Sequence, residues 1–386
     1  MDASAEPVVA SAHVTTPRWG AFALLCLAYF ATTTGEQMLS PLFPTAAEEL
    51  GMSVAQGGIA FAVLTASIAV TNLLGGAALG RWAPSTLVRL AALVGIVGSV
   101  VNATTPSYGV LLIGQALLGA AAGLFFPAGL RGVGIAAGTS KRGFAMGLYG
   151  VAFSLGLTMA ALLGAIGAGL GWRLPFWIAG GLYLVAALMV GRVDLGPRAA
   201  PGGDGPIPWR DVLSLPTYVG IVLAVLQYGA VPFLTTFAVT RWGISAAGAA
   251  GVLIVGRLLS IVAKVVGGAS ADRIGAKASA RRTSLVLTAT GLAWVLLPGG
   301  WPTYAVAAVF AGTVSSLGPV ANILAVERFG QHGMALGVYR SVQIALGAVG
   351  SAVVGLAAEA VGLRPTLTVA MLVPLMLLWI CRDRAR

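Results

Sequence analysis

The sequence predicts an all-α membrane protein with twelve transmembrane helices in two pseudo-symmetric six-helix bundles. The composition is strongly apolar, with 58% hydrophobic residues, 9% charged residues and a mean hydropathy of +0.92, whereas about a quarter of the residues in soluble domains are charged. The chain also repeats itself, because GGAALGRW at Gly75–Trp82 returns as GGASADRI at Gly267–Ile274, 192 positions later. A long repeat in so apolar a chain indicates two similar bundles that meet in the membrane.

Apolar stretches of roughly 20 residues, each long enough to cross the hydrocarbon as a helix, follow one another along both halves. In the first half we expect spans at about 19–40, 55–80, 86–104, 107–130, 141–169 and 172–191. In the second half we expect spans at about 215–240, 246–270, 281–299, 301–326, 332–361 and 364–381. A polar stretch rich in proline and glycine separates the two sets. The predicted organisation is therefore an N-terminal bundle at 1–195, a cytoplasmic linker at 196–211 and a C-terminal bundle at 212–386.

The distribution of Lys and Arg predicts the orientation, because short cytoplasmic loops retain basic residues. With both termini in the cytoplasm, 17 of the 23 basic residues fall on that side, and three (Arg173, Arg241 and Arg364) fall outside. The net charge of +11 then reflects topology and contact with anionic lipid headgroups, and no nucleic-acid partner is expected. We expect a multi-pass protein of the cytoplasmic (inner) membrane.

The chain has little raw material for metal or covalent catalysis. Its two cysteines, Cys26 and Cys381, lie near opposite ends of the chain, and its two histidines, His13 and His332, lie in a tail and a loop. No paired-carboxylate or HExxH arrangement occurs on a predicted helix, and no GxG pattern follows a strand or precedes a Walker lysine. We therefore expect no metal, no cofactor, no ATP site and no enzymatic activity.

A glycine-rich loop follows the eighth predicted span and reads Gly268-x-x-x-Asp272-Arg273-x-Gly275-x-Lys277. It resembles the cytoplasmic signature of the major facilitator superfamily, and the chain is similar to this family along essentially its whole length. The resemblance implies the family fold and alternating access, with glycines that allow close approach and an acid and a base that pair in one state only. The implied gating residues are Gly76, Arg81, Gly268, Asp272, Arg273, Gly275 and Lys277.

Two features refine the resemblance. Gly35-x5-Pro41-x-x-Pro44 in the first span resembles the pattern of twelve-helix drug:proton antiporters, which favours an exporter. The fifth span departs from the antiporter motif, because Leu157 follows Gly156 where proline is usual, and Gln115 stands in the fourth span where an Arg is common. In the first-half copy of the loop, Gly80 replaces the acid, so an asymmetric latch is implied.

Charges inside the spans indicate where the chemistry lies, because an ionised group at mid-membrane costs at least about 2.5–3.5 kcal/mol. Glu36 is the acidic residue well inside the first six spans, and its repeat partner is Gln227. A lone carboxylate in a low-dielectric cavity can exchange a proton as the cavity alternates between wet and dry. We expect Glu36 to carry the coupling proton or to pair with a cationic substrate; the alternative is a hydrated position near the outer mouth.

Three cations occupy the second half. Arg257 lies roughly 22 Å from Asp272 along its helix, too far to snorkel to the cytoplasm, so it needs a partner or an anionic substrate. Lys264 lies one heptad closer and can snorkel or pair locally. Arg340, in LGVYRSVQ, can reach the cavity or the inner interface. Two cavity arginines would suit a carboxylate or phosphate group. The predicted substrate-binding residues are Arg257, Arg340, Gln37, Gln227, Tyr228 and Gln343.

Three functions remain open. We favour a secondary active transporter that exports a small, partly hydrophobic compound in exchange for protons. The second reading is a carrier for uptake or exchange of a small organic anion through Arg257 and Arg340. The third is a membrane receptor or scaffold that binds without flux. Because one polypeptide holds both halves, we expect a monomer, with a small-molecule substrate and the lipid bilayer as its partners.

Overall fold

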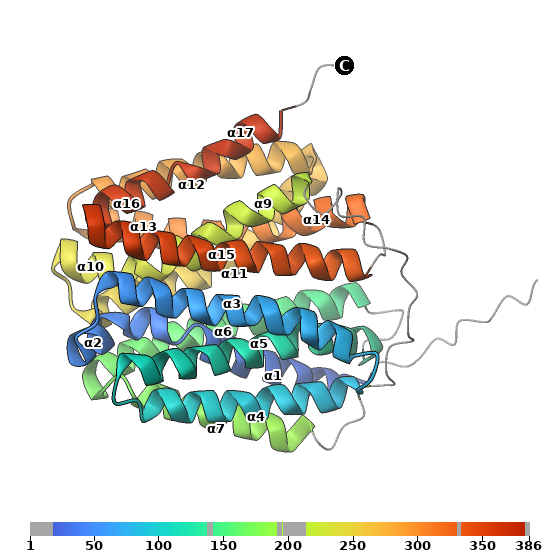
Figure 1. The fold of residues 1–386 in the computed structure, drawn as a ribbon. Helices are drawn as coiled ribbons and strands as arrows, with labels where there is room; N and C mark the ends of the chain where they lie inside the picture. The colour runs from blue at the N-terminus through green and yellow to red at the C-terminus, as the bar shows by residue number, and fades with distance from the viewer. Residues whose placement is uncertain (1–17, 137–141, 191–194, 196–213, 330–332, 383–386) are drawn as a thin grey trace, which may run out of the picture.

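The computed structural model shows long helices that run side by side in one bundle (Figure 1). The structure describes residues 18–136, 142–190, 195, 214–329 and 333–382. In this part of the chain all regular structure is helical, and nine helices are long and apolar enough to cross a membrane. The predicted all-α membrane fold is confirmed. The predicted linker at 196–211 lies outside the described residues.

The first half of the chain makes six helical passes. Capping explains how some of its helices begin: Ser53 and Gln56 form a reciprocal capping box, and Pro84 stands in a first turn, where its missing N–H costs nothing. The passes are α1 (Trp19–Glu36) continued by α2 (Leu39–Leu50), α3 (Val54–Ala78), α4 (Pro84–Ala103), α5 (Tyr108–Ala136), α6 (Arg142–Leu170) and α7 (Leu174–Val190).

The second half makes six more passes, three of which are interrupted. The seventh pass bends where Pro232 cannot donate an N–H to the helix, and a π-helical turn precedes it. The passes are α9 (Leu215–Ala224), η1 (Val225–Ala230), η2 (Val231–Phe233) and α10 (Leu234–Trp242); α11 (Ala246–Ile274); α12 (Ala276–Leu296); α13 (Trp301–Val314) with α14 (Leu317–Phe329); α15 (Gly333–Val361); and α16 (Leu363–Ala370) with η3 (Val373–Leu375) and α17 (Met376–Ile380).

Three predicted boundaries need correction, and one is the end of the fourth pass, which continues to Ala136 instead of 130. The first pass does not end near residue 40 but continues through α2, until Gly51 stops the helix in a left-handed conformation at φ 63°. Together α1 and α2 are roughly 48 Å long at 1.5 Å per residue, so the end of α2 projects beyond a hydrocarbon core of ~30 Å. The ninth pass begins at Ala276 instead of 281, because Gly275 at φ 84° makes the preceding turn.

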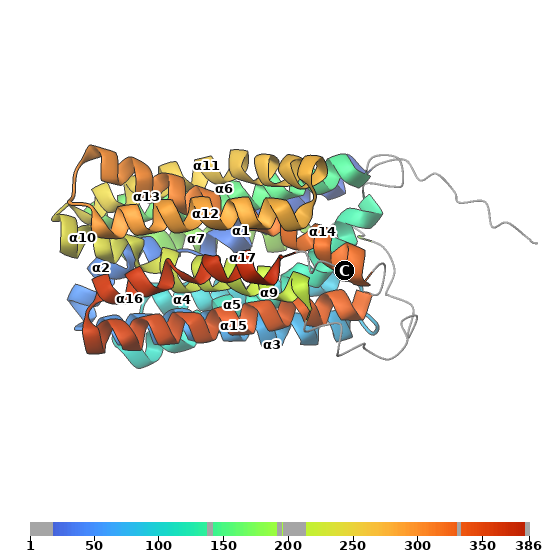
Figure 2. The same ribbon diagram turned by 90° about the horizontal axis from the view of Figure 1, so that it is seen from above.

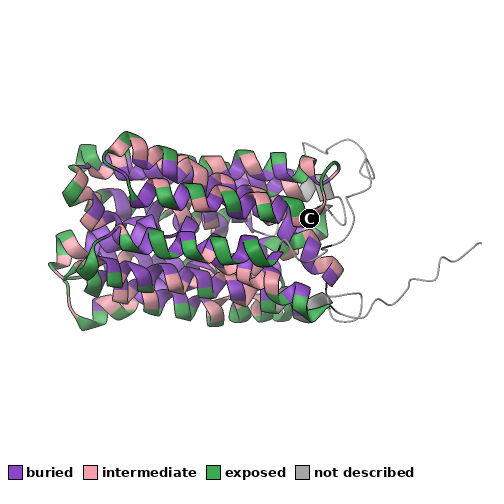
Figure 3. Cartoon of the chain, turned by 90° about the horizontal axis from the view of Figure 1, so that it is seen from below, coloured by how far each residue is buried: buried purple, intermediate pink, exposed green. Residues whose placement is uncertain are grey.

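The bundle has two distinct ends. α1 begins and α17 ends at one of them, which we call the terminal end, whereas α2 and α10 lie at the opposite, far end (Figures 1 and 2). Buried faces point between the helices and exposed faces point outward (Figure 3). The exposed positions include large apolar residues such as Leu170 (72%), Val265 (69%) and Trp379 (75%). In a membrane protein these side chains face lipid tails.

The two halves of the chain meet along two helix pairs, α3 with α15 and α6 with α11. In the first pair a Cβ on Gly58 would lie 2.7 Å from the Cα of Gly355, so glycine permits direct backbone contact. At the far end, Ser40 donates a hydrogen bond to the carbonyl of Pro232 (3.3 Å) and accepts one at its own carbonyl from Thr235 (2.8 Å). These contacts hold α2 against the seventh pass.

Candidate functional site

The centre of the site lies where equivalent positions of the two halves meet. The hydroxyl of Tyr228 in η1 donates to Oε1 of Glu36 at the end of α1, at 3.4 Å, and these residues are 192 positions apart. Ser40 and Pro232, which also bond, have the same separation. This is the offset of the Gly75 and Gly267 motifs. Because related positions touch each other only near a symmetry axis, Glu36 lies close to the pseudo-twofold axis of the molecule.

An amide bridge links Glu36 to a cation of the other half. Nε2 of Gln37 donates to Oε1 of Glu36 at 2.9 Å, and Oε1 of Gln37 accepts from Nη2 of Arg257 in α11 at 3.2 Å. One side-chain amide thus joins the carboxylate and the guanidinium, using its donor and its acceptor at once. Sequence reasoning placed these residues in the substrate site, and the structure brings them together in one chain of contacts.

Among Glu36, Gln37 and Arg257, two buried polar atoms make no hydrogen bond within the described residues. They are Oε2 of Glu36 and Nη1 of Arg257. Arg257 is 1% exposed and Glu36 is 3% exposed, so neither group reaches bulk solvent. A buried charge without its full set of partners is expensive. Oε2 of Glu36 is therefore available to bind a proton or to accept a hydrogen bond, and Nη1 of Arg257 is available to donate a hydrogen bond to a solute.

A cavity of about 20 Å³ adjoins the carboxylate. About 10–15 Å³ suffices for one water molecule, so the cavity is too small for an organic solute. Its lining comes from both halves and consists of Glu36, Gln37, Ser40, Phe61, Leu64, Thr65, Tyr228 and Pro232.

Lys264 lies two turns from Arg257 on α11, toward the terminal end. Its Nζ donates to Oγ of Ser154 in α6 at 2.8 Å and lies 4.5 Å from the ring centroid of Phe153, a cation–π distance. Lys264 thus pairs with the first half and does not snorkel to the membrane surface. The sequence left the role of Lys264 open, and the structure shows that Lys264 forms a contact between the two halves.

An aromatic cluster surrounds Tyr29 of α1 beside this contact. The ring of Tyr29 stacks on Tyr149 at 4.3 Å and on Phe125 at 5.4 Å, and it also meets Phe126 and Phe153. Tyr29, Phe126 and Phe153 keep part of their surface accessible although they stand well inside their helices. Phe153 also contacts Lys264 of α11, so the cluster adjoins the contact between the two halves.

The remaining predicted residues lie around this centre. Arg340 is exposed, and its Nη1 donates to Oε1 of Gln343 at 3.4 Å. The charges of both Arg257 and Arg340 act on Glu36. Gln227 and Gln343 are buried, and the Nε2 atom of each makes no hydrogen bond among the described residues.

Comparison with known proteins decides the family. Residues 25–351 match the family model described as the Major Facilitator Superfamily. The chain belongs to this superfamily. The predicted family and fold are therefore confirmed, and the protein is a membrane transporter and not an enzyme.

Three similar proteins place the chain within the superfamily. A chloramphenicol resistance protein of Streptomyces lividans is 29% identical over 298 residues, covering 74% of this chain and 72% of that protein. A probable sulfoacetate transporter of Cupriavidus necator is 28% identical over 163 residues, covering 42% and 38%. A solved structure of a bacterial homologue of the human lysosomal transporter Spinster, inward-facing and occupied, has a TM-score of 0.77 at 16% identity and covers 95% of this chain and 97% of that chain. The last likeness shows the fold alone.

The superfamily loop residues lie at the terminal end of α3 and α11. The closely packed glycines at this end are Gly75 and Gly267. A Cβ on Gly267 would lie 2.5 Å from the carbonyl oxygen of Ser316, whereas a Cβ on Gly76 would meet no atom within 4 Å. Gly268 lies near Pro319. The other predicted gating residues are exposed, namely Arg81, Asp272, Arg273, Gly275 and Lys277.

Sequence reasoning missed several residues of the site, namely Thr65 in the cavity lining, Ser154, which binds Lys264, and the ring of Tyr29. The repeat could have found the first, because Thr65 precedes Arg257 by the same 192 positions and lines the cavity from the other half. It gave no signal for Ser154 or Tyr29, whose partners depend on how the helices pack.

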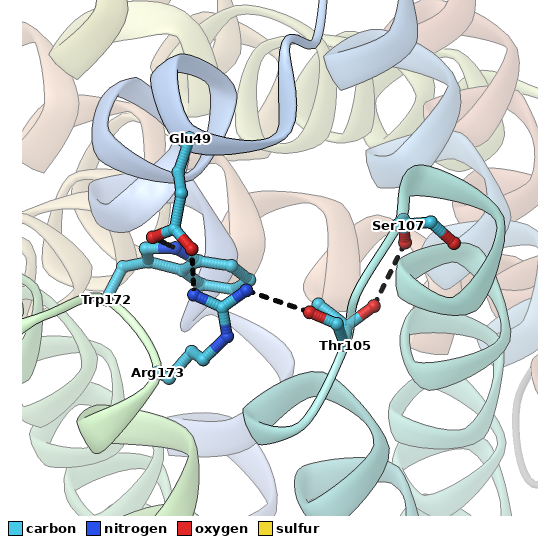
Figure 4. A network of polar contacts seen from close by, with 5 residues as sticks. All are labelled: Glu49, Thr105, Ser107, Trp172 and Arg173. Carbon is cyan, nitrogen blue, oxygen red and sulfur yellow. Dashed lines mark hydrogen bonds and ion pairs between the residues drawn. The ribbon is translucent and has the colours of Figure 1, made fainter.

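A polar network lies away from this centre, at the far end of the first half (Figure 4). The guanidinium of Arg173 forms an ion pair with Glu49 and donates to the carbonyl of Thr105 at 2.9 Å, while the indole of Trp172 donates to Glu49 at 2.8 Å. The hydrogen bonds from Arg173 and Trp172 hold the pKa of Glu49 below its ordinary value of 4.5. The Gly171–Arg173 segment thereby ties α2 to the start of α7.

Proposed function

We propose that this superfamily member exports a small, partly hydrophobic compound in exchange for protons, and that Glu36 is the proton-binding group. The observation that carries the proposal is the placement of a buried carboxylate at the axis, with one oxygen bonded across the two halves and the other oxygen unpaired. The coupling ion in this proposal is H⁺, no cofactor takes part, and a monomer with both termini in the cytoplasm works in the cytoplasmic membrane.

The contacts of Glu36 suggest how proton binding and movement are coupled. Ionised Glu36 attracts the Tyr228 hydroxyl and, through Gln37, the Arg257 guanidinium, both of which belong to the second half. Protonation removes the negative charge that both groups face, so it weakens the attraction between the halves at this level. A ligand that binds one arrangement better than the other then shifts the same equilibrium. Proton and substrate would thus act on one conformational change.

The neighbouring rings suggest the kind of compound. Tyr29 and the four rings around it form an apolar cluster in the first half that contacts Lys264 of the second half, which fits a substrate that carries an aromatic group. The similarity to a chloramphenicol resistance protein supports a drug-like compound of this kind. We therefore choose chloramphenicol as the first probe.

The test is proton movement in proteoliposomes that contain the purified protein and an internal pH-sensitive dye. Chloramphenicol added to wild-type vesicles is expected to drive proton flux above that of empty vesicles. Glu36→Gln keeps the size and the hydrogen bonding of the side chain but cannot ionise, so it is expected to bind the compound and to move no protons. Glu48→Gln is the matched control, because Glu48 is an exposed carboxylate of α2.

Equal proton flux in Glu36→Gln and in the wild type would sink the proposal. Saturable binding of the probe to the wild type without any flux would favour the receptor reading instead.

A second candidate function rests on the charge balance at the centre. The second half supplies three cations, Arg257, Lys264 and Arg340, and the charges of the two arginines act on Glu36. Nη1 of Arg257 has no partner among the described residues. A small organic anion would supply the missing counter-charge through a bidentate contact with a guanidinium. The similarity to a probable sulfoacetate transporter supports this reading.

Sulfoacetate serves as the probe for the second candidate. Uptake of labelled sulfoacetate into vesicles that Arg257→Gln abolishes and Glu36→Gln preserves would establish the anion carrier and replace the exporter. The absence of sulfoacetate uptake by the wild type would rule out the anion-carrier function.

A further inference from the structure

A groove of about 370 Å³ opens on the outer face of the second half, away from the centre between the halves. It lies between α11, α12 and the α13–α14 pair, helices that follow one side of the bundle (Figure 2). Its lining includes three small residues, Ala263 and Gly267 on α11 and Ser316 at the break between α13 and α14, where Gly267 packs directly against Ser316.

The walls of the groove are apolar and face the bilayer. Val262 is 60% exposed, Val266 59% and Val286 46%, and these values describe surfaces that only lipid tails or an apolar ligand can cover in a membrane. Along α11 the lining runs from Leu259 to Ser270, roughly 16 Å at 1.5 Å per residue. This is about half of a ~30 Å hydrocarbon core, the depth of one leaflet.

The terminal end of the groove carries a positive charge. Arg282 lines it there, one turn before Val286 on α12, together with the hydroxyls of Ser270 and Thr283. Arg282 is exposed and forms no ion pair within the described part of the chain. Arg273, Lys277 and Arg281 are exposed at the end of α11 and the start of α12, with exposed Asp272 beside them, so the net charge around this end of the groove is positive.

We propose that this groove binds an anionic phospholipid, with one acyl chain along α11 and the headgroup phosphate on Arg282. The length of the apolar walls fits the tail, and the guanidinium with its two neighbouring hydroxyls fits the phosphate oxygens. A neutral apolar ligand would fill the walls but would leave Arg282 without a counter-charge.

Comparison of the two repeats indicates that this lipid site occurs in the second half only. The first-half position that corresponds to Arg282 is Leu90, 192 residues earlier, and Lys277 corresponds to Ser85. The first half therefore lacks the cation that would hold a headgroup at the equivalent place. One lipid per chain is expected at this type of site.

The test is native mass spectrometry of the purified full-length protein with equimolar phosphatidylglycerol and phosphatidylcholine of identical acyl chains. The wild type is expected to retain phosphatidylglycerol preferentially. Arg282→Gln is expected to lower that retention about fivefold, because one basic residue near an anionic lipid surface contributes ~1 kcal/mol. Arg281→Gln is the matched control, since Arg281 has the same charge, is equally exposed and does not line the groove.

A second variant tests the tail. Ala263→Phe places a ring in the groove without changing its charge, and it is expected to lower the retention of both lipids. If Ala263→Phe does not fold, Val286→Phe serves as the replacement variant. Equal losses in Arg281→Gln and Arg282→Gln would overturn the proposal in favour of diffuse attraction to a basic surface. Retention that glycerol phosphate abolishes, or that Ala263→Phe and Val286→Phe leave intact, would also overturn it, because the acyl chain would then have no part.

Discussion

The two helix pairs that join the halves use the same position of the repeat in different ways. In α3, Nδ2 of Asn72 donates to Oγ of Ser341 in α15 at 2.9 Å; in α11, Nζ of Lys264 donates to Oγ of Ser154 in α6 at 2.8 Å. Asn72 and Lys264 are 192 positions apart. One pair is thus tied by a neutral amide and the other by an ammonium group that also contacts a ring.

The two halves therefore have corresponding helices, but the cations at these positions occur in the second half. Arg257 and Lys264 in α11 correspond to Thr65 and Asn72 in α3, so the cations face the centre from one side only. The neutral pair also has the closer backbone contact, at Gly58 and Gly355. We infer that α3 and α15 form the firmer contact and that α6 and α11 form the contact whose strength depends on charge.

The largest effect is expected from filling the glycine contact. In Gly58→Ala the new Cβ would lie 2.7 Å from both the Cα of Gly355 and the carbonyl oxygen of Ser351. Backbone cannot move aside as a flexible side chain can, so we expect a loss of about 1–3 kcal/mol and a lower midpoint of thermal unfolding. Gly181→Ala in α7 is the control, because its Cβ meets nothing within 4 Å. Similar midpoints for the two variants would show that α3 and α15 do not need the close contact.

Double-mutant cycles compare the two polar ties directly. For Asn72→Ala with Ser341→Ala we expect a coupling of about 0.6 kcal/mol, the average for hydrogen bonds between membrane helices. For Lys264→Ala with Ser154→Ala we expect about twice that value, because the donor is charged. Thermal unfolding of each single and double variant measures both couplings.

This prediction is tested by which of the two coupling energies is larger. A larger coupling for the neutral pair would mean that Lys264 mainly packs on Phe153 and that the bond to Ser154 adds little.

The smallest effect is expected at Glu49, at the far end of α2. Its pKa is lowered in the folded protein, so its ionised form stabilises the fold above the unfolded pKa, and this contribution disappears as the pH falls through the lowered value. Because the side chains of Glu49 and Arg173 are 53% and 32% exposed, we expect only ~0.2–1 kcal/mol. The difference in unfolding midpoint between the wild type and Glu49→Gln should be present at neutral pH and absent well below pH 4.5. A difference that does not change with pH would contradict this account.

Much of the fold was readable because the membrane restricts what a sequence can do. Hydropathy and the repeat predicted the helical passes, and the resemblance of the loop at Gly268–Lys277 indicated the family. The cost of burying charge directed attention to Glu36 and Arg257. Both residues are buried at the centre. The extension of the first pass to Leu50 was not predicted, because an apolar span of roughly 20 residues from position 19 ends near position 40, and α2 continues the pass beyond it.

The missing parts of the site depend on geometry between helices. The bridge formed by Gln37 needs its amide to reach two partners from different halves, and nothing in the spacing of one helix encodes that reach. The aromatic cluster around Tyr29 combines rings from α1, α5 and α6, and any of these rings alone is ordinary core. Pairing Glu36 with Gln227 was one position away from the contact that forms, which is with Tyr228.

The bond between Glu36 and Tyr228 has a consequence for how such a chain can evolve. In a homodimer of one half, the same side chain would stand on both sides of the twofold axis, so a glutamate there would face its own copy. Two carboxylates in that place would repel each other and could not both ionise. Fusing the two halves into one gene lets the two positions mutate independently, and a single carboxylate can then stand at the axis opposite a hydroxyl that binds it.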